Sequence, residues 1–206
     1  MPPVDPSQHD RFFLQQRIRP VINQYECSTL AADGKSAGEA VCFVEQKRFK
    51  FKEDLRAFTD ASKREELFRI KARQAFDPRA RYKVTDASGA HIGELGKAFG
   101  KSLLRSTWEI FDSGGSKIGW AQERSVPVAL LRRAVGFIPY VENVADWLPI
   151  PYHFDWYRGD EPVGGLSRVL GLRDRYVLDL AGDSERVIDR RVALALAVGM
   201  DAMQAR

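Results

Sequence analysis

The residues best suited to chemistry are cations that recur on short alternating segments. Between Lys47 and Arg105 there are 16 Lys and Arg against 8 Asp and Glu, although the whole chain carries a net charge of only +4. Alternate residues of a strand face the same side, so such cations form a strip suited to phosphate oxygens. The candidate ligands for an anionic headgroup are Lys47, Arg48, Lys50, Lys52, Arg69, Lys71, Arg73, Arg81 and Lys83.

A cationic strip of this kind has more than one interpretation. It can be a solvated exterior that discourages pairing between sheet edges, a surface for anionic lipid, or a surface for nucleic acid or an acidic protein. Zinc fingers, recognition-helix patterns and RNP-type aromatic motifs are absent from the sequence, so nucleic acid is not an expected partner. The interpretation we carry forward is weak, salt-sensitive docking on anionic membrane headgroups of the phosphoinositide type.

Acidic residues gather before the last segment of the chain, at Asp179, Asp183, Glu185 and Asp189. Their spacing does not match the twelve-position calcium loop, with its Gly at position 6 and Glu at position 12. The three histidines are scattered and have no ligand spacing. We therefore predict no metal site and no cofactor.

Nucleophilic chemistry also finds little support. In the stretch 93–102, Gly96 and Gly100 precede a Lys-Ser pair, but only three residues separate these two glycines where a phosphate loop has four. His153 and Asp155 share one strand face without a serine or cysteine tied to them. The expectation is a protein that is not an enzyme.

The two cysteines flank the turn at Asp33-Gly34 almost symmetrically. With that turn as the centre of a hairpin, Cys27 and Cys42 are expected to face each other across two strands. A cytoplasmic setting favours reduced thiols over a disulfide.

The elements that position these residues are hairpins with a regular spacing. Turn signals begin at Asp33, Asp60, Asp86 and Asp112, separated by 27, 26 and 26 residues. An alternating segment flanks each turn, typically with an apolar-Gly pair after it. We predict strands over 11–18, 24–31, 39–47, 54–59, 66–73, 80–86, 91–97, 106–111, 117–123, 152–158, 162–169 and 174–180.

The last segment, 184–206, is predicted to be a buried helix that begins near a cap at Asp183 or Ser184. Val192 to Met200 is apolar throughout, but at about 1.5 Å per residue this run is too short to cross a bilayer, which takes about 20 residues. Twelve antiparallel strands and one all-apolar helix predict an all-β fold with a central helix. The strands form a closed barrel, and the helix fills its interior.

The domain organisation follows from this pattern. Residues 1–10 hold three prolines and are expected to form a flexible leader, and 11–206 a single barrel domain. Residues 126–152 are a Pro-rich, apolar insertion with helical character. The insertion is interpreted either as a plug at one barrel mouth or as a surface that enters a membrane interface or binds a partner.

Four stretches carry a resemblance to a known family: FLQQRIRPVINQYE (13–26), YKVTDASGAHIGEL (82–95), WEIFDSGGSKIGW (108–120) and DRRVALALAVGMDAMQ (189–204). They resemble the LURP-one-related family, within the group that contains the Tubby C-terminal domain and the phospholipid scramblases. The resemblance implies the same twelve-stranded barrel. It also implies a role at membranes, because Tubby domains bind phosphoinositide headgroups and scramblases act on lipids with calcium. No short Tubby lipid-contact motif matches here, so no such residue is carried over.

Composition sets the remaining expectations. Hydrophobic content of 44% with 29% charged residues is ordinary for a soluble globular chain, and the first residues lack a signal-peptide pattern. We expect a cytoplasmic protein, peripheral at the inner membrane face if it docks on lipid. Three roles stay open at this point: a lipid-docking barrel, a scaffold that binds a protein through 126–152, and scramblase-like lipid handling.

Overall fold

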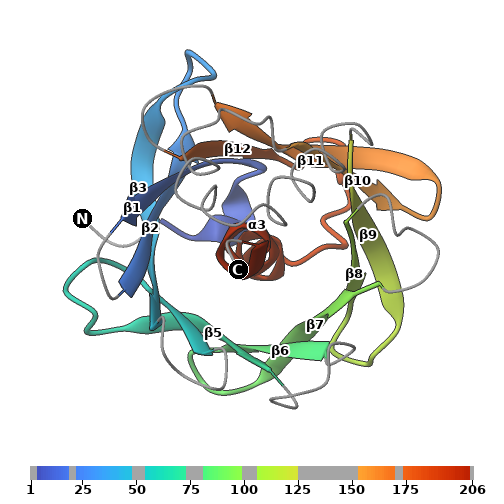
Figure 1. The fold of residues 1–206 in the computed structure, drawn as a ribbon, viewed down its shortest axis with the longest axis horizontal. Helices are drawn as coiled ribbons and strands as arrows, with labels where there is room; N and C mark the ends of the chain where they lie inside the picture. Colours follow the sequence, from blue (N-terminus) through green and yellow to red (C-terminus); the bar gives the residue numbers. More distant parts are fainter. Residues whose placement is uncertain are drawn as a thin grey trace, which may run out of the picture.

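Twelve antiparallel strands close into a barrel around one helix (Figure 1). The computed structural model describes residues 4–18, 22–47, 54–72, 81–98, 106–124, 153–169 and 174–204. The elements are η1 (Pro6–Gln8), β1 (Arg11–Ile18), β2 (Ile22–Leu30), β3 (Ala37–Lys47), β4 (Asp54–Phe58), β5 (Glu66–Ala72), β6 (Arg81–Asp86), β7 (His91–Lys97), β8 (Thr107–Phe111), β9 (Lys117–Glu123), β10 (His153–Arg158), β11 (Glu161–Val169), β12 (Arg175–Asp179) and α3 (Arg190–Gln204).

Each strand pairs with its neighbours in the sequence, and β1 pairs with β12 to close the sheet, with Arg11 opposite Asp179. Closure leaves the sheet without an edge strand. The predicted fold class is confirmed, and each strand boundary lies within two residues of the predicted one. Periodicity predicts this fold well because every strand pair is local, apart from the closing one.

The regular turns are built around their aspartates. Asp33 accepts hydrogen bonds from the N–H groups of Lys35 (2.8 Å) and Ser36 (2.9 Å), and Asp86 accepts one from Ser88 (2.9 Å). A hydrogen bond from the Ser88 hydroxyl is the main reason that the pKa of Asp86 lies below its ordinary value. These turns also place a residue in the left-handed region, namely Gly34, Lys63, Gly89 and Gly115.

The glycine that follows a turn makes room for the chain inside the barrel. A Cβ atom on Gly93 would lie 2.8 Å from the Phe111 carbonyl oxygen and 3.0 Å from a methyl group of Val192 on α3. Gly119 has a similar place on β9, where a Cβ atom would lie 2.9 Å from the Tyr157 carbonyl oxygen and 3.4 Å from Ile188. The glycine of the repeated apolar-Gly pair therefore lets the strands pack closely against the neighbouring strand and against residues at and just before the start of α3.

The helix α3 occupies the middle of the barrel (Figure 1). Val192 to Val198 and Met200 are at most 2% exposed, which confirms the predicted buried helix. The predicted start near Ser184 is wrong, because α3 begins at Arg190. Asp189 caps it by accepting a hydrogen bond from the Arg191 N–H (2.8 Å), since Asp183 serves the preceding turn. No helix in the described ranges is long and apolar enough to span a bilayer.

The residues before β1 lie at the end of the barrel where the chain passes from β12 toward α3. Pro6 is buried, and the Asp10 carbonyl accepts a hydrogen bond from the Leu180 N–H (2.8 Å). The prolines of 1–10 led us to expect a flexible leader, and these contacts were not predicted. Residues 1–3 and the insertion 126–152 lie outside the described residues.

Substitution of Gly93 tests the close packing of β7 against β8 and α3. We expect Gly93→Ala to lower the free energy of unfolding by about 1–3 kcal/mol, because the methyl group meets a backbone oxygen that cannot easily move. Urea denaturation measures the change. Gly114→Ala is the control, since its Cβ atom would meet only the Asp112 carboxylate at 3.3 Å. Equal loss in the two variants would refute the packing role.

Candidate functional site

The structure describes the side chains of four of the nine predicted headgroup ligands. Arg69 and Lys71 lie on β5, and Arg81 and Lys83 on β6. Lys47 is the last residue of β3, and nothing beyond its backbone is described. The other four lie outside the described residues: Arg48, Lys50, Lys52 and Arg73.

Lys71 and Lys83 are brought face to face. They are register partners across β5 and β6, and the neighbouring residues Ile70 and Val84 are buried in the core, so both lysines point outward. Within the described part of the chain, neither ammonium group has a hydrogen bond or ion pair. Side chains opposite each other on antiparallel strands have Cβ atoms about 5 Å apart, and like charges there repel.

A second cationic pair lies beside the first. Arg56 on β4 and Arg69 on β5 are register partners, and Arg69 shares the outer face of β5 with Lys71. We call Arg56, Arg69, Lys71 and Lys83 the basic face. The sequence prediction missed Arg56, although the alternation of Leu55, Arg56 and Ala57 is the signal that would have placed it outward.

Arg81 is not part of the basic face, because its guanidinium is engaged elsewhere. It stacks on the Phe111 ring at 3.6 Å, and its Nη1 lies 3.4 Å from Oε2 of Glu94. The Glu94 side chain is 2% exposed and also contacts His91 at 3.5 Å. Glu94 is the register partner of Lys83, but its carboxylate turns to these other groups.

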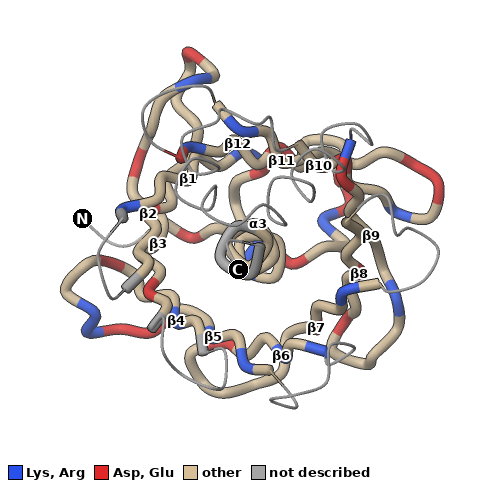
Figure 2. Tube along the Cα trace, in the orientation of Figure 1, with Lys and Arg blue, Asp and Glu red and all other residues tan. Residues whose placement is uncertain are grey.

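The basic face is therefore small and mixed with acidic positions. Figure 2 shows Lys and Arg on the neighbouring strands β4, β5 and β6, with Asp and Glu interspersed. Glu45 on β3 is the register partner of Arg56, and Asp54 on β4 is that of Lys71. Such a surface holds a few phosphate oxygens better than it holds a long polyanion.

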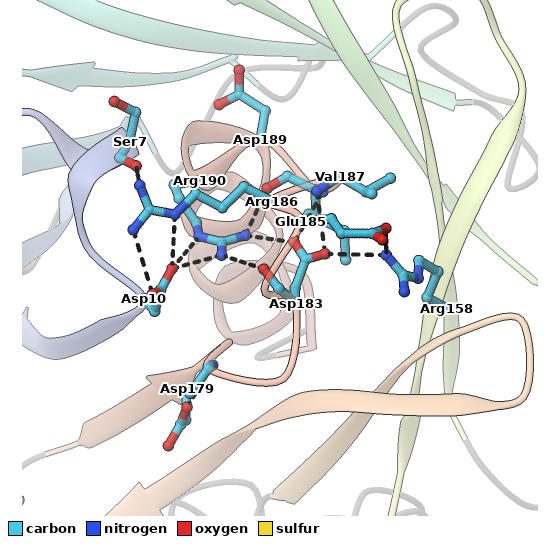
Figure 3. A network of polar contacts seen from close by, with 12 residues as sticks. Ser7, Asp10, Arg158, Asp179, Asp183, Glu185, Arg186, Val187, Asp189 and Arg190 are labelled. Atoms are coloured by element: carbon cyan, nitrogen blue, oxygen red, sulfur yellow. Dashed lines mark hydrogen bonds and ion pairs between the residues drawn. The ribbon is translucent and has the colours of Figure 1, made fainter.

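An ion pair with both side chains buried lies at one barrel mouth, around the start of α3 (Figure 3). The Asp183 side chain is 0% exposed, and its Oδ2 lies 2.6 Å from Nη1 of Arg190, which is 2% exposed. Asp183 also accepts hydrogen bonds from the N–H groups of Val187 (3.2 Å) and Ile188 (3.1 Å). Nη2 of Arg190 reaches Oδ1 of Asp10 at 2.7 Å. This network ties the first strand to the last turn and the helix.

The acidic residues singled out by the sequence are all paired with arginines. Besides Asp183 with Arg190, the pairs are Asp179 with Arg11 (3.0 Å), Glu185 with Arg158 (2.6 Å) and Asp189 with Arg191 (2.7 Å). Figure 3 shows Asp179 and Asp189 apart from the central network. Among the described residues, no three His, Cys, Asp or Glu side chains are grouped as a metal would require.

The described surface includes hollows at two places that bear on the site. One, of about 440 Å³, opens at the same mouth, between Leu67, Val187 and the arginines Arg186 and Arg191. These arginines are already paired with Asp10 and Asp189. The other, of about 350 Å³, lies over β1 to β3 and includes Phe13 and Phe43.

The comparisons with known proteins agree with the fold. A family model described as LURP-one-related matches residues 40–201, which is most of the chain. A search of the curated proteins finds no match.

The buried pair of Asp183 and Arg190 gives a stability prediction. We expect Arg190→Met to lower the free energy of unfolding by about 3–5 kcal/mol, because it leaves a buried carboxylate without its cation. Urea denaturation measures the loss. Arg191→Met is the control, since its pair with Asp189 is about one-third exposed and is expected to contribute less than about 1 kcal/mol. Similar losses in the two variants would contradict the structural role of the buried pair.

Asp10 gives a prediction about how the stability of the fold changes at low pH. Burial raises the pKa of Asp10, but the hydrogen bonds and charges of Arg190 and Arg186 outweigh burial, so the pKa lies below its ordinary value of 3.8. A depressed pKa means that this contribution to stability is complete above the unfolded-state value and disappears as the pH falls through the folded-state value. We expect Asp10→Asn to be destabilised at pH 7 and to lose less further stability than the wild type between pH 5 and 2. Parallel loss of stability in the two proteins would refute the prediction.

Proposed function

The chain belongs to the LURP-one-related family, and on that premise we propose that it is a non-catalytic barrel module that docks on anionic membrane headgroups through the basic face. The observation that carries the proposal is the Lys71–Lys83 pair. Two ammonium groups stand opposite each other without an anionic partner in the described part of the chain. A phosphate group placed between them would turn their repulsion into attraction.

The neighbouring arginines extend this surface across three strands. Arg56 and Arg69 are register partners two residues along β5 from Lys71, so they add positive charge beside the lysines. Each basic residue near an anionic leaflet contributes on the order of 1 kcal/mol. Four such residues give weak docking that salt screens, which suits a peripheral protein at the inner membrane face.

The second candidate is a scaffold that binds a protein through the insertion 126–152. Its support is the apolar composition of that segment. We rank it below lipid docking because the insertion lies outside the described residues, whereas the Lys71–Lys83 pair is defined by strand register. Scramblase-like lipid handling ranks third.

A vesicle experiment tests lipid docking. We expect the wild type to sediment with phosphatidylcholine vesicles that contain about one-quarter anionic lipid, and to be released as salt is raised. The double variant Lys71→Gln, Lys83→Gln should bind about 10- to 30-fold more weakly, since two cationic contacts of about 1 kcal/mol are lost. The control variant Lys35→Gln, Lys117→Gln removes the same charge from two lysines at the other end of the barrel wall and should bind within about threefold of the wild type.

Three results would contradict the proposal. Equal sedimentation with neutral and anionic vesicles at low salt would exclude headgroup recognition. Equal weakening in both double variants would show that only the net charge matters. Full vesicle binding by the Lys71, Lys83 variant would place the contact elsewhere, and the insertion 126–152 would become the next region to substitute.

A further inference from the structure

The two cysteines form a pair inside the barrel wall. Cys27 on β2 and Cys42 on β3 are register partners, as predicted from the position of the first turn. Residues opposite each other on antiparallel strands have Cα atoms about 4.5 or 5.5 Å apart, and a disulfide accepts Cα separations of about 4.4–6.8 Å. The two thiols are free and buried.

The local strand geometry favours close approach of the sulfur atoms. Directly after Cys27 the register shifts: Ser28 pairs with Ala40, which leaves Val41 as an extra residue on β3. Such a bulge bends the strand and increases its local twist. The residues on the other side, Tyr25 and Val44, are in regular register. The cysteines thus face each other at the boundary between regular and bulged pairing.

A route from solvent to the pair is also present. Cys27 and Cys42 are 1% and 4% exposed, but both line the hollow of about 350 Å³ that includes Phe13 and Phe43. This volume accommodates a small oxidant such as hydrogen peroxide. Cys42, as the more exposed of the two, is the sulfur that such an oxidant meets first.

We propose that Cys27 and Cys42 are a redox site that a peroxide converts into an intramolecular disulfide. The Cys42 sulfur, as thiolate, attacks one peroxide oxygen; the O–O bond breaks and the leaving hydroxide takes up the thiol proton as water. The Cys42 sulfenic acid is then attacked by the Cys27 sulfur, the S–O bond breaks, and a second water leaves with the Cys27 proton. Two thiols are oxidised and one peroxide is reduced to two waters.

The environment makes this reaction slow and its product durable. The hydrogen bond to Cys42 and burial both raise the pKa of the Cys27 thiol, which slows its attack on the Cys42 sulfenic acid at neutral pH. A buried disulfide, in turn, is poorly accessible to the glutathione pool. The pair therefore responds to sustained oxidant rather than to a brief pulse. This inference is independent of lipid docking.

The consequence for the molecule is a closed hairpin. The bond joins β2 and β3 on either side of the turn at Asp33-Gly34, and the loop that it closes contains residues 28–41. Closing a loop of this size should raise the melting temperature by roughly 5–10 °C. The oxidised and reduced forms then differ in the stability of the longest hairpin of the barrel.

The test treats the folded full chain with hydrogen peroxide, blocks remaining thiols with an alkylating agent and digests the protein without reductant. We expect mass spectrometry to show one cross-link between the peptides that contain Cys27 and Cys42, a loss of the mass of two hydrogen atoms, and the higher melting temperature. Cys27→Ser and Cys42→Ser are matched controls, which keep one thiol each and should show no rise in melting temperature with peroxide. If a serine variant does not fold, Cys27→Ala and Cys42→Ala replace it.

Several results would overturn the proposal. One is a gain of oxygen mass on each cysteine, or covalent dimers, in place of the intramolecular bond. Another is a cross-link that forms only after the chain has been unfolded in urea. A fall in melting temperature on oxidation would show that the strand geometry does not accommodate the bond.

Discussion

The structure depends on covering one apolar helix. The segment from Val192 to Met200 has no polar face to offer water, so α3 is stable only when apolar side chains surround it on all sides. A closed sheet is the simplest enclosure that leaves no strand edge unpaired. The pairing of β1 with β12 completes this enclosure, and for that reason the barrel and the helix stabilise each other.

Polar groups are needed where the chain turns from β12 into the barrel to start α3. The chain must turn from β12 into the interior, and the buried N–H groups of that turn need acceptors. Asp183 supplies them, and the Arg190 guanidinium pairs with its carboxylate at 2.6 Å. Arg190 then reaches Asp10, so the start of the first strand and the start of the helix are held by one guanidinium (Figure 3). Of the acidic residues that precede the helix, Asp183 is the one that serves this junction.

The outer face of the barrel is free to carry function because the inner face carries the stability. On β5 and β6, Ile70 and Val84 are buried in the barrel core, while Lys71 and Lys83 face each other on the outside. The basic face and the cysteine pair are thus both products of strand register. One places like charges together on the exterior, and the other places two thiols together in the wall.

The sequence by itself determined the strands, the barrel, the buried helix and the facing cysteines, because alternation and turn spacing act between neighbours along the chain. It also identified Lys71 and Lys83 as outward cations, but not that they oppose each other, and it missed Arg56. It placed the helix start at Ser184, because Asp183 resembles a cap until its partner Arg190 is known. Only the tertiary structure decided which charges are neutralised, since Asp183 with Arg190 and Asp10 with Arg190 are contacts fixed by how the barrel closes and by where the helix enters.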